Sequence, residues 1–63
     1  MKIKLEIRDR SRERAPITGY SRENLVRRMF GRTAYGLNVR IDEPFTVVGA
    51  AGRVLGSAII HEA

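Results

Sequence analysis

The sequence predicts a small α+β domain in which one amphipathic helix packs on one face of a mostly antiparallel sheet. Three patterns support this prediction. Residues 2–8 alternate between apolar and charged side chains, residues 21–31 place apolar side chains at helical spacing, and residues 37–61 contain three short extended runs separated by turn residues. Because the last three runs are closely linked, we expect them to form an antiparallel meander after a β-α start.

The first extended run, residues 2–8, is typical of a strand with one buried and one solvated face. Ile3, Leu5 and Ile7 share one side, and the charged residues share the other. The sequence leaves open whether this strand lies at an edge of the sheet or between other strands. Residues 9–20 follow as an arginine-rich loop, because Pro16 and Gly19 indicate irregular backbone. If the strand continued instead, its alternate arginines would project to one side.

Residues 21–31 carry the signals of a complete helix. Ser21 is a suitable N-cap, Glu23 is favourable in the first turn, and Gly31 can adopt a conformation that ends the helix. The apolar face holds Leu25, Val26, Met29 and Phe30, and the opposite face holds Glu23, Asn24, Arg27 and Arg28. We therefore expect the apolar face to cover the sheet.

The C-terminal half predicts a three-stranded meander within residues 37–61. The expected strands are 37–41, 45–48 and 53–60, separated by a turn at 42–44 and a hairpin loop at 49–52. The glycines of that loop have the spacing of a backbone-gripping loop, but such a loop joins helices, so turn geometry is the better explanation. The predicted core of the domain is Ile3, Leu5, Ile7, Leu25, Val26, Met29, Phe30, Leu37, Val39, Ile41, Phe45, Val47 and Ile59.

Length and composition limit how the domain is stabilised. A chain of 63 residues forms one domain, 1–63, with a small core, and it has no cysteine for disulfides. Self-association or a bound partner is the expected extra support, so a homodimer is one expectation, for which the apolar last strand could offer an edge. We expect a cytoplasmic protein with no membrane interaction, because no apolar run is long enough to cross a bilayer and no signal peptide is present.

Charge is distributed unevenly along the chain. The formal net charge is +5, and residues 1–32 hold ten of the twelve basic residues with only four acidic ones. Ten of the basic residues are arginine, whose planar guanidinium suits phosphate and carboxylate groups. This asymmetry indicates a basic surface for a polyanionic partner, although a solvated charged surface with helical ion pairs such as Glu23–Arg27 is the simpler explanation.

Catalysis is not expected. The chain has no cysteine nucleophile and one histidine, His61, near its end, where an exposed side chain without a special role is the expectation. The neighbouring carboxylates of Asp42 and Glu43 fit a turn better than an acid–base pair. We therefore predict no enzyme activity, no cofactor and no metal site.

Nucleic-acid binding is the leading functional prediction. Arginines can displace counterions from a phosphate backbone, and without aromatic side chains on the outward strand positions we expect backbone-dominated binding of duplex DNA. Tyr35 is the one residue placed to stack on a base. The predicted binding residues are Arg10, Arg12, Arg14, Arg27, Arg28 and Arg32, with Lys2, Lys4, Arg40 and Tyr35.

A protein-binding module is the alternative. The same arginines would then pair with carboxylates on an acidic partner, as in a small inhibitor or adaptor, for example one encoded by a mobile element that blocks a host nucleic-acid-processing complex. No stretch of the sequence has a pattern specific enough to name a family.

Overall fold

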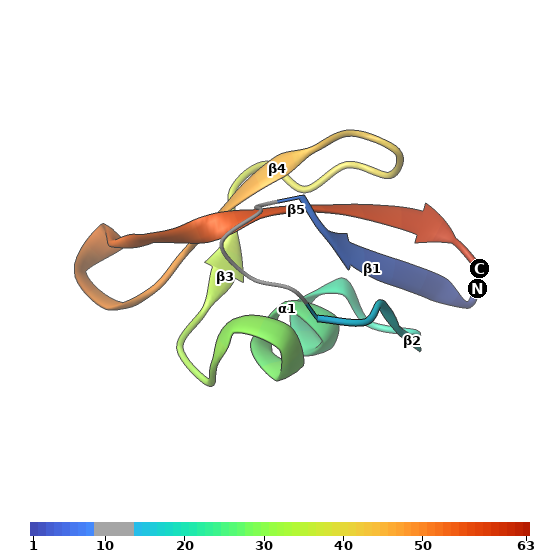
Figure 1. Cartoon of the computed structure of the whole chain (residues 1–63), viewed down its shortest axis with the longest axis horizontal. Helices are drawn as coiled ribbons and strands as arrows, with labels where there is room; N and C mark the ends of the chain where they lie inside the picture. The colour runs from blue at the N-terminus through green and yellow to red at the C-terminus, as the bar shows by residue number, and fades with distance from the viewer. Residues whose placement is uncertain (9–13) are drawn as a thin grey trace.

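The computed structural model describes residues 1–8 and 14–63, and it has the predicted α+β class. One helix lies below a curled antiparallel sheet, as Figure 1 shows. The elements are β1 (Ile3–Ile7), β2 (Ile17–Gly19), α1 (Arg22–Phe30), β3 (Tyr35–Gly36), β4 (Phe45–Val48), a short 3₁₀ turn η1 (Ala50–Gly52) and β5 (Val54–Glu62).

The long strand β5 lies at the centre of the sheet, whose strand order is β2-β1-β5-β4-β3. The first part of β5 pairs with β4 and the last part pairs with β1, so that Ile3 lies opposite Glu62 and the two termini are adjacent (Figure 1). The first strand therefore lies inside the sheet. Strand β5 pairs with β4 along its first part and with β1 along its last part, and both partners reach Ala58, so neither side of β5 is free along its whole length. A homodimer through this strand remains a prediction.

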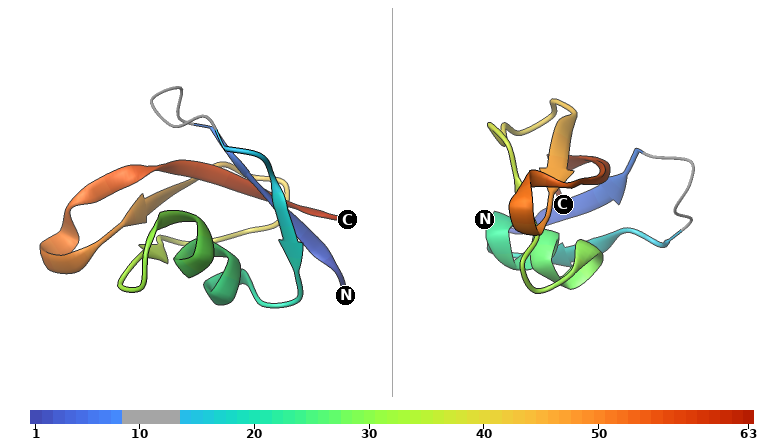
Figure 2. Two further views of the ribbon diagram at one scale, coloured as in Figure 1. Left: turned by 60° about the horizontal axis from the view of Figure 1, so that its bottom comes forward. Right: turned by 90° about the vertical axis from the view of Figure 1, so that its left-hand side faces the viewer.

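Helix α1 closes the core from one face of the sheet, and Figure 2 shows the sheet curling over it. Its N-cap is as predicted: the Asn24 amide donates to Ser21 Oγ at 3.2 Å. The helix ends before Gly31, whose φ of 132° is unfavourable for residues with a side chain. The buried apolar cluster is Ile3, Leu5, Leu25, Val26, Met29, Phe30, Ala34, Phe45, Val47, Ala58 and Ile60, with Ile7, Val39 and Ile41 partly buried against it.

Residues 37–41 are not the strand that their alternation predicted. Asn38 and Asp42 have φ angles of 50° and 65°, which interrupt an extended backbone, and only Ile41 forms an isolated bridge, to Ile60. Leu37, predicted to be in the core, is 45% exposed. The predicted antiparallel meander is present as β3-β4-β5, but its first strand is the two-residue β3 and not residues 37–41.

Strand β3 forms between the predicted helix, residues 21–31, and the predicted strand, residues 37–41, where the sequence indicated no strand. Tyr35 and Gly36 pair with Val48 and Val47. A β-carbon on Gly36 would lie 2.5 Å from Val39 Cγ2 and 2.8 Å from the Phe45 ring, so only glycine fits there. This close approach lets residues 34–39 lie against α1 and the sheet at once.

Strand β2 corrects the prediction of a loop over residues 9–20. Residues 17–19 pair with β1 in the register Ile3 with Gly19 and Leu5 with Ile17. The rest of the predicted arginine-rich loop includes Arg10 and Arg12, which lie outside the described residues. A three-residue strand is too short for an alternation pattern to reveal.

Candidate nucleic-acid interface

The structure separates the predicted binding residues into different surfaces. Lys2 and Lys4 flank or lie on β1, Arg27 and Arg28 lie on α1, and Arg32, Tyr35 and Arg40 lie in or beside the chain that follows the helix. Alternation along β1 places Lys4 on the face of the sheet away from the helix, because Ile3 and Leu5 point into the core. The predicted residues that the structure describes therefore lie on at least two surfaces.

On the outer face of the sheet, Lys4 lies beside a carboxylate that reduces its net charge. Lys4 Nζ lies 3.3 Å from Glu6 Oε1, and Glu6 Oε2 lies 3.9 Å from His61 Nε2. His61 Nδ1 lies 2.6 Å from Asp42 Oδ1, which ties the end of β5 to the loop after β3. His61, expected to be an exposed terminal side chain, is partly buried and contacts Asp42. The contact with Glu6 makes Lys4 a weaker candidate for phosphate binding.

Two predicted binding arginines have structural contacts. Arg14 Nη1 donates to the Met29 carbonyl oxygen at 2.7 Å, which satisfies an acceptor in the last turn of α1. Arg28 Nη1 lies within 3.4 Å of the Thr18 carbonyl oxygen on the edge strand β2. The Arg14 contact is partly buried and short, so Arg14 is mainly a helix cap, whereas Arg28 is exposed and has a longer contact.

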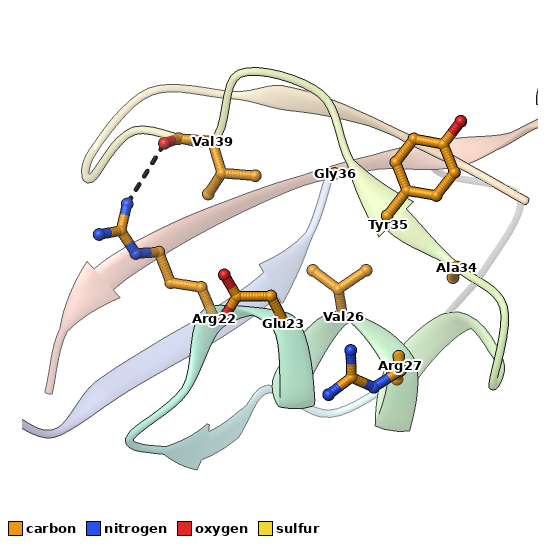
Figure 3. A pocket seen from close by; sticks show the side chains of 8 residues that line it. All are labelled: Arg22, Glu23, Val26, Arg27, Ala34, Tyr35, Gly36 and Val39. Atoms are coloured by element: carbon orange, nitrogen blue, oxygen red, sulfur yellow. Dashed lines mark hydrogen bonds between the residues drawn. The ribbon is translucent and has the colours of Figure 1, made fainter.

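A groove between α1 and the β3 segment brings the remaining candidates together. Its volume is about 360 Å³, and Figure 3 shows the side chains that form it. Val26 and Ala34 are buried and form apolar surface, while Tyr35, on β3, is 50% exposed. The lining residues are Arg22, Glu23, Val26, Arg27, Ala34, Tyr35, Gly36 and Val39. We call this the α1–β3 groove.

Arg22 is a groove residue that the sequence analysis did not select. It is the first residue of α1, one turn before the buried Val26, and its Nη1 donates to the Val39 carbonyl oxygen at 3.3 Å. This contact crosses from the helix to the chain after β3, as the dashed line in Figure 3 shows. The i, i+4 spacing between Arg22 and Val26 was the signal that could have placed it beside the apolar face.

The arginines of the groove carry charge that the described part of the chain does not neutralise by contact. Within residues 1–8 and 14–63, the ion pairs involve Lys4 and His61, and no arginine lies within 4.0 Å of a carboxylate oxygen. The predicted Glu23–Arg27 ion pair is therefore absent. A guanidinium has five N–H donors, so Arg22 retains free donors beyond its single backbone contact.

Glu23 is the one acidic side chain of the groove. A hydrogen bond from the backbone and another from the Ser21 hydroxyl, with smaller contributions from Arg22 and Arg27, hold the pKa of Glu23 below its usual value of 4.5. Ser21 Oγ lies 3.2 Å from Glu23 Oε2. Glu23 is therefore ionised at neutral pH, and it stabilises the helix N-terminus that positions Arg22.

Comparisons with known proteins give no relative: no protein-family model, curated protein or solved structure matches this chain. Within the described residues, no cluster of three or more His, Asp or Glu side chains could hold a metal ion. Among the same residues, no helix is long and apolar enough to cross a membrane. The α1–β3 groove and its surrounding arginines are the features on which the functional proposal is based.

Proposed function

We propose that the protein is a non-enzymatic nucleic-acid-binding domain, and that the exposed arginines on and after α1 contact the phosphate backbone. The observation that carries the proposal is that Arg22, Arg27, Arg28 and Arg32 lie along one segment of 11 residues without a carboxylate contact among the described residues. The helix fixes the spacing of Arg22, Arg27 and Arg28, and Arg32 follows the helix after Gly31. The net charge of +5 supports the same partner class, because a polyanion is attracted at long range.

Arginine on a rigid helix is suited to this role. Each guanidinium can donate two parallel hydrogen bonds to one phosphate, and each phosphate neutralised releases condensed counterions into solution. The core residues Leu25, Val26, Met29 and Phe30 hold the helix on the sheet, so little ordering of the backbone is needed when a ligand binds. We expect duplex DNA to be bound through its backbone.

The test is charge reversal with a matched control. Arg27→Glu combined with Arg28→Glu removes two helix cations, and the control combines Arg8→Glu with Arg53→Glu, which are exposed and lie outside α1 and the groove. Both variants change the net charge equally. Affinity for labelled duplex DNA is measured by fluorescence anisotropy at low salt, with circular dichroism to confirm folding.

We expect the helix variant to lose binding and the control variant to retain most of it. Equal losses in the two variants would show that only net charge matters and would remove the interface from α1. Full binding by the helix variant would place the site elsewhere on the chain.

An acidic protein partner is the second candidate. The observation that favours it is the exposure of Tyr35 and Leu37 next to the arginines, since aromatic and arginine side chains are enriched in protein interfaces. If no nucleic acid binds at low salt, an inhibitor or adaptor that recognises an acidic protein surface becomes the leading proposal. The helix arginines would then be the variants to test in a protein-binding assay.

A further inference from the structure

We propose that the α1–β3 groove binds one unpaired nucleotide of a nucleic-acid strand, with Tyr35 stacking on the base and Arg27 contacting the adjoining phosphate. This inference rests on the proposed function and gives it a preferred substrate: nucleic acid in which a duplex adjoins unpaired bases. Backbone contacts by arginines alone would not distinguish paired from unpaired nucleotides.

The size of the groove favours a single nucleotide. A volume of about 360 Å³ lies at the lower end of the range of small-molecule sites, so the groove is suited to one planar ring and not to a duplex edge. The hydrogen bond from Arg22 Nη1 on α1 to the Val39 carbonyl oxygen, at 3.3 Å, also crosses the groove and limits its extent. A base entering it would therefore lie between the helix and the β3 segment.

The lining chemistry fits a base better than a phosphate at the centre of the groove. Val26 and Ala34 lie buried at the base of the groove, and the accessible ring among its lining residues is that of Tyr35, which is 50% exposed. Figure 3 shows Tyr35 on the strand side, with its ring extending away from α1, and Arg27 on the helix side. Every base has a flat aromatic face, so stacking on tyrosine tolerates any sequence.

The charges of the groove favour one orientation of the nucleotide. The ionised carboxylate of Glu23 repels a phosphate from the part of the groove that it lines. Arg27 lies one helical turn further along α1 and makes no ion pair within the described residues, so its guanidinium is available for the phosphate. The strand would then continue from Arg27 towards Arg28 and Arg32, which contact the neighbouring duplex in the proposed function.

The test compares three DNA probes at one salt concentration. The first is a blunt duplex, the second is the same duplex with a short single-stranded extension, and the third carries an abasic extension with the same phosphates. The protein variants are Tyr35→Leu, which removes the ring, and Tyr35→Phe, which keeps it. Tyr20→Leu is the matched control, because Tyr20 is 77% exposed and lies outside the groove.

We expect the wild-type protein to bind the extension with bases more tightly than the abasic one by roughly fivefold to a hundredfold, the range typical of one stacked base. Tyr35→Leu should abolish this preference, and Tyr35→Phe and Tyr20→Leu should preserve it. Equal affinity for the base-containing and abasic extensions, or equal behaviour of Tyr35→Leu and Tyr20→Leu, would overturn the inference. If the blunt duplex still binds in those cases, the proposed function survives; if no probe binds at low salt, both are rejected.

Discussion

Deleting the same side chain at Leu25 and at Leu37 tests the packing of the domain most directly. Leu25 lies on the inner face of α1 and is 0% exposed, whereas Leu37 is 45% exposed although its alternation with polar neighbours predicted burial. Leu25→Ala removes fully buried atoms and leaves a cavity, so we expect a loss of about 2–5 kcal/mol in the free energy of unfolding. Leu37→Ala loses partly solvated surface, so we expect a loss below about 1 kcal/mol.

The total stability expected of so small a domain makes the difference between the two variants easy to detect. A domain of 63 residues is expected to have a total stability of about 3–9 kcal/mol, so Leu25→Ala removes a large part of it and Leu37→Ala does not. Urea denaturation followed by circular dichroism gives both values. Equal losses, or a larger loss at Leu37, would show that residues 37–41 are packed as a strand and that the described fold is wrong in this region.

Two further predictions concern β3 and the helix N-terminus. Gly36→Ala should destabilise the domain by about 1–3 kcal/mol, because the new methyl group would overlap Val39 and Phe45; an unchanged thermal midpoint would contradict the close approach. Glu23→Gln should lower the thermal midpoint at neutral pH. The pKa of Glu23 is depressed in the folded state, so its carboxylate stabilises the fold fully above the usual pKa of 4.5 and loses this effect as the pH falls through the folded-state pKa. The thermal midpoints of the wild type and the variant should therefore converge in acid. A difference that stays constant with pH would refute the electrostatic cause.

The sequence was sufficient for elements with strong local signals. The Ser21 cap, the apolar spacing from Leu25 to Phe30 and the alternation around Leu5 predicted α1 and β1 within one or two residues. The strands near 45–48 and 53–60 were also correct within similar limits. These features depend on contacts between near neighbours, which the amino-acid pattern records directly.

The errors arise where distant parts of the chain decide the conformation. Residues 37–41 alternate as a strand does, but Asn38 adopts a positive φ and the backbone pairs with β4 at Tyr35 instead. Strand β2 exists because β1 offers it an edge, and three residues cannot show a period. The position of β1 between β2 and β5 is likewise a property of the assembled sheet.

The candidate site was predictable in its residue types but not in its shape. Arg27 and Tyr35 were selected from the sequence as separate features, and the groove that unites them depends on the β3 pairing. Arg22 was missed because its role depends on a carbonyl group at Val39. Conversely, Lys4 and Arg14 were selected, and their contacts with Glu6 and the helix end are visible only in the folded chain.

The salt dependence of duplex DNA binding is the most direct test of the proposed interface. Fluorescence anisotropy gives the association constant over a series of salt concentrations, and each neutralised phosphate contributes a slope of about −0.9 to the plot of log affinity against log salt. With Arg27, Arg28 and Arg32 engaged, we expect a slope of about −2.7 or steeper, and no binding by the helix double variant under the same conditions. Absence of binding at the lowest salt concentration, or an affinity independent of salt, would contradict the proposal.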